Sequence, residues 1–102
     1  MLVRSKSERL IDDWLYDHKI RAEYERSLPL AGYVISPDFY LPDHDIYIEH
    51  LGLLESNDEY RKDWQWKKSL YDKHGVKYVV LIESDIGELD RNLSFKLRQY
   101  LK

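Results

Sequence analysis

Two carboxylates, Asp38 and Glu49, are the residues of this sequence best placed to do chemistry. Pro37-Asp38 ends one predicted strand and Glu49 lies on the next, and a turn at 41–45 folds the second strand back on the first. We therefore expect the two acids to lie side by side across the hairpin. Carboxylates this close repel each other unless one is protonated or a cation lies between them. Oxygen ligands in a chain without cysteine favour Mg²⁺ or Mn²⁺; the alternative is a pair of solvated acids flanking a turn.

The residues around Glu49 favour a functional role for this acid over an ordinary exposed position on the surface. Both faces of the predicted strand 46–51 are largely apolar, so Glu49 is expected to be partly buried, and a buried carboxylate needs a partner. The four histidines show no ligand-like spacing, so no imidazole ring is expected to bind a metal. The ring of His50 should point away from Glu49.

A predicted helix at 57–74 supplies the complementary charge. Five of its residues fall close to one side: Tyr60, Trp64, Lys67, Lys68 and Tyr71. A neighbouring stripe of Trp66 and Leu70 could face the sheet. A lysine flanked by aromatics is a plausible cation for a phosphate or an attacking water. The alternative is an aromatic core with lysines at its rim.

These residues need a scaffold of alternating helices and strands. The capping box Ser5-x-x-Glu8 predicts a helix over 5–18, and the remaining patterns predict strands at 20–25, 33–40, 46–51 and 76–83, helices at 57–74 and 86–101, and a breaker segment at 27–32. Pro37 implies an edge position or a bulge, and the strand at 76–83 should be buried on both faces. The order α-β-β-β-α-β-α indicates one α/β domain spanning residues 1–102.

Composition sets the class of protein. The chain has 102 residues, enough for one domain, and its 43% hydrophobic and 14% aromatic content excludes a disordered segment. No apolar run is long enough to span a membrane, and the N-terminus carries no secretory signal. We expect an intracellular, cytoplasmic domain, associated with the nucleoid if it acts on DNA.

Charge is divided unevenly along the chain. The formal net charge is −3, yet residues 36–60 hold seven acids and no lysine or arginine, which leaves 16 basic and 12 acidic residues elsewhere. A mildly basic body around an acidic centre predicts weak affinity for nucleic acid by an isolated monomer. Dimerisation, or a partner that delivers DNA, would compensate.

The strings SPDFYLP, IYIEHLG and WKKSLY, in this order, resemble the PD-(D/E)XK nuclease superfamily, and especially the nuclease-type domain associated with some superfamily 1 DNA helicases. The resemblance runs from Glu8 to Glu83. It implies a restriction-endonuclease-like αβββαβα core with a mixed four-stranded sheet flanked by helices. It also implies hydrolysis of DNA phosphodiester bonds in repair, recombination or replication, and permits a homodimer or a helicase-like partner.

The resemblance assigns roles to individual residues. Asp38, Glu49 and the backbone carbonyl of His50 match the ligands of Mg²⁺ or Mn²⁺, and Glu8 matches an acid that supports the metal or its water. The lysine of the signature is replaced by Leu51. Lys67 from the following helix would take over, with Lys68 as the substitute, and Tyr71 would line the site.

Substrate contacts are expected from basic side chains. The candidates for the phosphate backbone are Arg61, Lys62, Lys67, Lys68 and Lys73, with Arg91, Lys96 and Arg98 on the last helix as secondary candidates. Two alternatives stay open. One is a catalytically degenerate nuclease-fold module that docks nucleic acid or a protein; the other is a small protein-binding domain with incidental acids.

Overall fold

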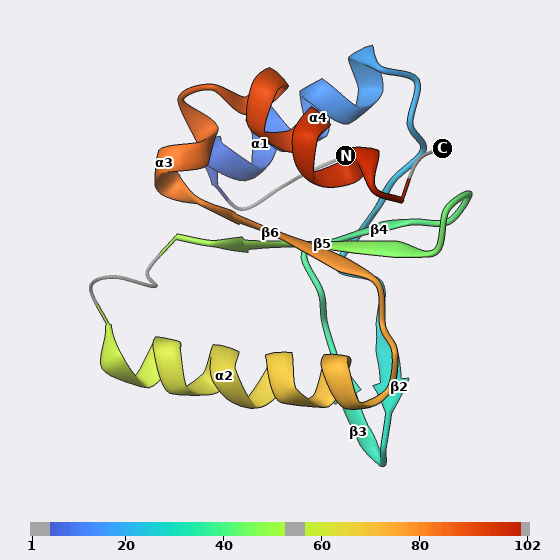
Figure 1. Ribbon diagram of the computed structural model, residues 1–102, viewed down its shortest axis with the longest axis vertical. Coiled ribbons are helices and arrows are strands. Elements are labelled where there is room, and N and C mark those ends of the chain that lie inside the picture. Colours follow the sequence, from blue (N-terminus) through green and yellow to red (C-terminus); the bar gives the residue numbers. More distant parts are fainter. Residues whose placement is uncertain (1–4, 53–56, 101–102) are drawn as a thin grey trace.

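A four-stranded sheet separates two helical layers (Figure 1). The computed structural model describes residues 5–52 and 57–100. Helices α1, α3 and α4 cover one face of the sheet, while α2 and a small hairpin cover the other (Figure 1). The elements are α1 (Lys6–Asp17), β1 (Glu23–Tyr24), β2 (Leu28–Leu30), β3 (Tyr33–Ile35), β4 (Phe39–Leu41), β5 (Ile46–Leu51), α2 (Asp58–Lys73), β6 (Tyr78–Ile82), α3 (Glu83–Ile86) and α4 (Leu89–Arg98).

The sheet has the strand order β1-β4-β5-β6. Strands β4 and β5 form an antiparallel hairpin in which Phe39 lies opposite Ile48 and Leu41 opposite Ile46. Strand β6 joins β5 in parallel, which requires a crossover, and α2 provides it. The chain therefore has the expected α/β class, with a mixed four-stranded sheet flanked by helices.

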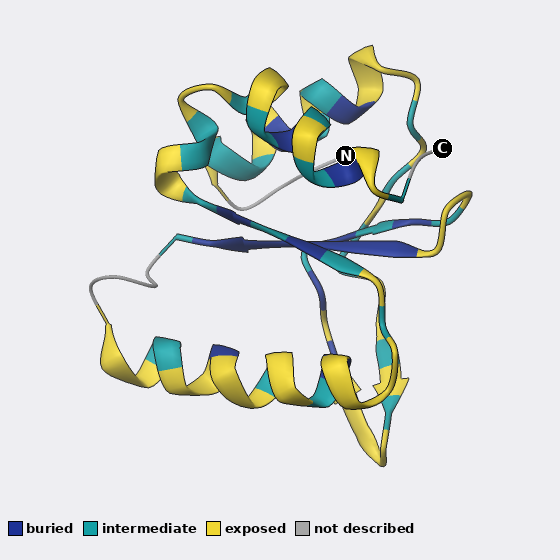
Figure 2. Cartoon of the chain, in the orientation of Figure 1, coloured by how far each residue is buried: buried dark blue, intermediate teal, exposed yellow. Residues whose placement is uncertain are grey.

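Each face of the sheet has its own apolar core. The larger core, between the sheet and the α1–α4 layer, consists of Ile11, Leu15, Phe39, Leu41, Ile46, Ile48, Val79, Leu81, Leu93 and Leu97. The smaller one, on the α2 side, consists of Ile35, Leu51, Trp64 and Tyr71. Strand β5 is buried along its whole length, as Figure 2 shows, so any polar residue on it must find a partner inside the protein.

The two long helices begin where their caps predict. The Ser5 hydroxyl accepts a hydrogen bond from the backbone N–H of Glu8, and the Asn57 side chain accepts one from Tyr60 N–H. Ser56 directly precedes Asn57 and is also of a residue type that caps helices, but it lies outside the described residues. The expected stripe on α2 is wrong for Trp66, which is 48% exposed, because Trp64 and Tyr71 face the sheet instead.

The predicted breaker segment at 27–32 is wrong, because it contains strand β2 and a tight turn. Strands β2 and β3 pair from Leu28–Ile35 to Leu30–Tyr33, leaving a two-residue loop. Ala31 and Gly32 in that loop both have positive φ, 53° and 84°, which suits the right-handed twist of a hairpin. Pro29 is tolerated because β2 pairs with a strand on one side only.

Two further predicted elements are interrupted. The strand expected from Tyr33 past Pro37 splits into β3 and β4, since proline has no N–H for a ladder; Pro37 lies in the connection between them. Of the strand expected at 20–25, only Glu23–Tyr24 pairs with a neighbour.

The C-terminal region also differs from prediction. The helix expected at 86–101 begins later, as α4 at Leu89, and a short helix α3 precedes it, starting at the last residue of the expected strand. The Asp85 carboxylate accepts a hydrogen bond from Ile82 N–H at the start of α3. Strand β6 is shorter than expected and fully buried on one face only. Lys96 of α4 reaches this edge strand, where its Nζ donates to the Val80 carbonyl at 2.6 Å.

Within residues 5–52 and 57–100, no helix is both long enough and apolar enough to cross a bilayer.

The β2–β3 turn gives a direct test of the hairpin. Replacing Ala31 by Asn creates an Asn-Gly turn, and asparagine tolerates positive φ better than alanine does. We expect Ala31→Asn to raise the free energy of unfolding by about 0.5–1 kcal/mol in urea titrations. Gly32→Ala should lower it, because a Cβ is strained at φ 84°. A lower unfolding free energy for Ala31→Asn and a higher one for Gly32→Ala would contradict this turn geometry.

Candidate functional site

Strand β5 divides the site into two halves. Glu49 and His50 are consecutive, so their side chains leave opposite faces of the sheet, and both are buried, at 1% and 9% exposure. Glu49 contacts α2, whereas the His50 ring meets Glu8 of α1 and Glu83 of α3. The ring therefore points away from Glu49, as expected.

Glu49 is held by two donors from α2. The Lys67 ammonium lies 3.0 Å from Oε2 of Glu49, and the Tyr71 hydroxyl donates to the same oxygen at 2.7 Å. Lys67 and Tyr71 are four residues apart on the helix, so one face presents both. Burial raises the pKa of Tyr71 first, and the charge of Glu49 raises it further, which keeps the phenol a hydrogen-bond donor.

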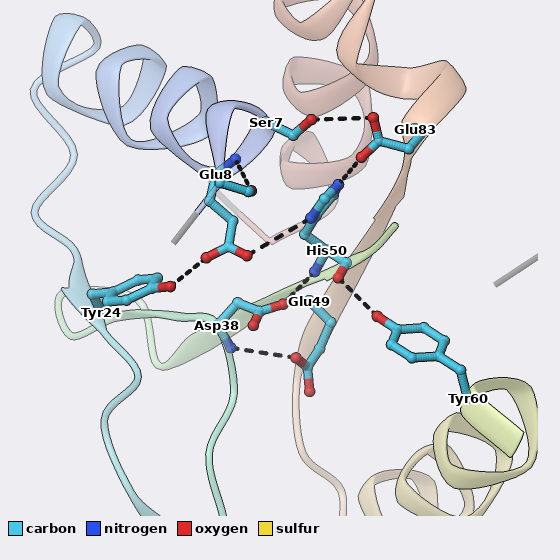
Figure 3. A network of polar contacts seen from close by, with 9 residues as sticks. Ser7, Glu8, Tyr24, Asp38, Glu49, His50, Tyr60 and Glu83 are labelled. Carbon is cyan, nitrogen blue, oxygen red and sulfur yellow. Dashed lines mark hydrogen bonds and ion pairs between the residues drawn. The ribbon is translucent and has the colours of Figure 1, made fainter. Parts of the chain in front are cut away.

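Asp38 lies directly across from Glu49. Extending the β4–β5 register by one residue places the two opposite each other, and the backbone N–H of Asp38 donates to Oε1 of Glu49 at 3.3 Å. Oδ2 of Asp38 accepts a hydrogen bond from the backbone N–H of His50 at 2.6 Å (Figure 3). The sequence expectation of two neighbouring carboxylates is confirmed as a matter of geometry.

The charge of this pair is only partly compensated. Burial raises the pKa of Asp38 to about 7, and the negative charges of Glu49 and then Glu8 act in the same direction. The His50 N–H and the Lys67 ammonium oppose this rise. Near neutral pH Asp38 is therefore partly ionised beside Glu49, and the Lys67 ammonium contacts Glu49, an arrangement that would gain from an added cation.

The other half of the site is a chain of polar contacts through His50. Its Nε2 lies 2.5 Å from Oε1 of Glu83, and Oε2 of Glu83 accepts a hydrogen bond from the Ser7 hydroxyl. Nδ1 lies 4.0 Å from Oε2 of Glu8, and the Tyr24 hydroxyl donates to the other oxygen of Glu8 (Figure 3). The network ties the end of β5 to α1 and to the end of β6.

A pocket of about 250 Å³ opens on the α2 side of these acids. Its walls are Asp38, Glu49, His50, Leu51, Tyr60, Asp63, Trp64 and Lys67. Three carboxylates, one ammonium and a phenol therefore line one small cavity with an apolar wall, which is a typical composition for a binding site.

The structure brings most of the predicted site residues together. Glu8, Asp38, Glu49, the His50 carbonyl, Lys67 and Tyr71 all belong to this region. Leu51, where the family signature has its lysine, is buried in the α2-side core. The Lys67 ammonium reaches Glu49 from α2.

Other predicted residues lie elsewhere. Lys68 is exposed and pairs with Asp72 at 2.6 Å, on a side of α2 away from the pocket. Arg61 pairs with Asp58, and Lys62 is exposed. Arg91, Lys96 and Arg98 belong to α4, across the sheet from the pocket (Figure 1).

Sequence reasoning missed Asp63, Glu83 and Ser7. Asp63 stands four residues before Lys67, so helical spacing could have placed both beside the pocket. Glu83 directly follows the buried strand β6, and side chains at the carboxyl ends of parallel strands meet at one edge of a sheet. That signal existed but depended on knowing that β6 pairs with β5.

Few protein oxygen atoms would be available to a hard divalent ion at this site. Among the residues described, no group of three or more histidine or acidic side chains is arranged around one ion position. Asp38 and Glu49 do offer two oxygens, Oδ1 and Oε1, that carry at most the long 3.3 Å hydrogen bond. The His50 carbonyl, which accepts from Tyr60 at 3.3 Å, would be a third ligand. Mg²⁺ commonly uses one or two carboxylates and keeps several waters.

Comparisons with known proteins give no identification: no protein-family model matches the chain, and no curated protein or solved structure is similar to it.

The raised pKa of Asp38 predicts a pH-dependent stability. Asp38 is harder to ionise in the folded protein than in the unfolded chain, where its pKa is about 4. Its protonated form therefore stabilises the folded state fully below pH 4, and this contribution is lost as the pH rises through about 7. Asp38→Asn keeps an oxygen for the His50 N–H but carries no charge. In chelator-containing buffer we expect this variant to exceed the parent at pH 8 by roughly 2 kcal/mol of unfolding free energy.

The advantage should shrink towards pH 4, where the parent's Asp38 is protonated. Asp13→Asn, at an exposed position on α1, is the control and should show no such pH-dependent gain. Parallel stability curves for parent and Asp38→Asn from pH 4 to 8 would contradict the assignment.

Proposed function

We propose that this protein is a metal-dependent nuclease that hydrolyses DNA phosphodiester bonds, with a restriction-endonuclease-like core. The observation that carries the proposal is the meeting of Asp38, Glu49 and Lys67 at one pocket, from β4, β5 and α2. It joins a pair of hard oxygen ligands to a cation that can face a phosphate. The motif order of the sequence supports the same reading.

Each side chain has a distinct task in this proposal. Asp38 and Glu49, with the His50 carbonyl, hold Mg²⁺ or Mn²⁺, which when bound supplies a lowered water pKa and charge compensation at the phosphoryl oxygens. Lys67, a quarter exposed, can move its ammonium from Oε2 of Glu49 to orient the attacking water or to stabilise the developing oxyanion. Tyr71 keeps Glu49 in place by its hydrogen bond.

Glu8 acts from the other face of the sheet. Its charge acts on the Asp38 carboxyl, and its own orientation is fixed by Tyr24 and by the approach of the His50 ring. We assign Glu8 the support of the metal or of its water. Repair, recombination or replication is the setting that the resemblance suggests.

One observation favours the catalytically degenerate alternative. Lys67 and Tyr71 already satisfy one oxygen of Glu49 from within the chain, so the fold does not need an ion to bury this acid. A module that kept the fold and lost catalysis would retain Lys67 and Tyr71 beside Glu49 and would not bind a metal ion. Metal binding and cleavage therefore have to be measured separately.

Metal binding should appear as thermal stabilisation at pH 8. Mn²⁺ at a hundred times its dissociation constant adds about 2.7 kcal/mol, which for a domain of this size raises Tm by roughly 10 °C or more. We expect the shift in the parent and its loss in Glu49→Gln and Asp38→Asn, measured by calorimetry. A parent that melts at the same temperature with Mn²⁺ and with chelator would support the degenerate module.

Cleavage should separate the two adjacent lysines of α2. Lys67→Gln keeps a polar, unbranched side chain but removes the ammonium beside Glu49, so we expect at least about a hundredfold loss of kcat with the Mn²⁺ stabilisation retained. Lys68→Gln, whose partner is Asp72, should keep most of the activity. The assay follows circular, linear and branched DNA on gels with Mg²⁺ and Mn²⁺.

The acid variants complete this test. Full metal-dependent cleavage by Asp38→Ala would contradict the proposed site. If Lys68→Gln lost more cleavage activity than Lys67→Gln, the role given to Lys67 would belong to Lys68.

A further inference from the structure

The surface of α2 beside the pocket carries an exposed aromatic corner. Trp66 is 48% exposed and Tyr33 of the β2–β3 hairpin 53% exposed, and their rings meet edge to face with centroids 5.0 Å apart at 85°. The other two tryptophans are less exposed: Trp64 is buried, and Trp14 is partly buried against the larger core. Trp66 is thus the tryptophan that the fold leaves to solvent.

Basic side chains flank this corner along the helix. Lys62 and Lys73 lie four residues before and seven after Trp66, so all three share one stripe of α2, and both lysines are exposed. One acid, Glu59, lies on the same stripe at the first turn of the helix. The stretch from Lys62 to Lys73 therefore presents a cation, an aromatic ring and a second cation in a row along about 16 Å of helix.

The corner is also next to the candidate site. Trp66 precedes Lys67 directly, and Asp63, one turn earlier, lines the pocket. A strand that crosses this stripe would have to turn by about 100° around α2 to reach Lys67 and the acids. From the exposed corner towards the pocket, the strand would meet the aromatic rings first, then the ammonium of Lys67, and then the carboxylates of Asp38 and Glu49.

We propose that Trp66 and Tyr33 form a stacking platform for the bases of single-stranded DNA, with Lys62 and Lys73 on its phosphates. A base in a duplex hides its faces in the stack, so an aromatic ring of this kind can engage only an unpaired base. A protein partner would gain little from the two flanking ammonium groups, whereas a polyanion with planar bases uses every element of the stripe.

The inference deepens the proposed nuclease function and rests on it, since it names the substrate class as DNA with an unpaired segment. The corresponding experiment separates the two claims because it measures binding alone. Binding is measured with Asp38→Asn protein in the presence of chelator, so that no metal-dependent cleavage occurs during the measurement. Cleavage is measured separately with the parent protein. Either result can therefore be negative while the other is positive.

The test compares labelled single-stranded and blunt duplex oligonucleotides of about 20 nucleotides by fluorescence anisotropy at low salt. We expect the single strand to bind more tightly, and Trp66→Ala to weaken its binding about five- to a hundredfold. Trp66→Phe should retain most of the affinity while losing the part of the tryptophan fluorescence quenching that comes from Trp66. Duplex binding should change little in both variants.

Matched controls lie on the other side of the sheet. Phe95→Ala removes another exposed aromatic, 72% exposed on α4, and should leave the affinity within about twofold. Lys62→Gln and Lys73→Gln should each lower the slope of log affinity against log salt by about 0.7, whereas Lys19→Gln should not. All variants are checked for parental Tm before binding is measured.

Three results would overturn the platform. They are equal effects of Trp66→Ala and Phe95→Ala, parental affinity for the single strand in Trp66→Ala, and tighter binding of the duplex than of the single strand by the parent.

Discussion

The burial of one charge, that of Glu49, constrains the structure more than any other interaction. At 1% exposure this carboxylate has left water, and leaving it unpaired would cost several kcal/mol. Lys67 and Tyr71 therefore have to come from the same face of α2, and that face must lie against β5. The crossover helix α2 is therefore held against the sheet by its hydrogen bonds to Glu49 as well as by its apolar contacts. The pocket forms where α2 and β5 meet in this way.

The backbone of His50 connects the two faces of the sheet. Its N–H engages Asp38, its carbonyl accepts from Tyr60, and its ring contacts Glu83 at the end of the neighbouring strand. A residue with three such roles leaves little freedom to the end of β5. Gly52 fits this picture, because a Cβ there would come within 3.2 Å of the His50 ring and 3.4 Å of Glu83.

Much of the site was predictable because its signals are local. A turn of fixed length sets which residues face each other across a hairpin, which was enough to pair Asp38 with Glu49. Helical periodicity and caps were enough to place Lys67 and Tyr71 on one face of α2. Both signals can be read from short stretches of sequence.

The remainder depends on which segments become neighbours. The contact of His50 with Glu83 requires β6 to lie beside β5, and nothing near either residue encodes that pairing. The β2–β3 hairpin was missed for a different reason: proline and glycine usually end a strand, but here Gly32 makes the turn itself and Pro29 lies on an unpaired edge. Trp66 was misplaced because a large aromatic on a helix is most often core.

The contact between Lys96 and the Val80 carbonyl has a consequence for assembly. Strand β6 is the last strand of the sheet on its side, and a bare edge of this kind invites a strand from another molecule. Here an ammonium group, steadied by Asp85 at 3.3 Å, already occupies a hydrogen-bonding position of that strand. Growth of the sheet from chain to chain at this edge would have to break this contact first.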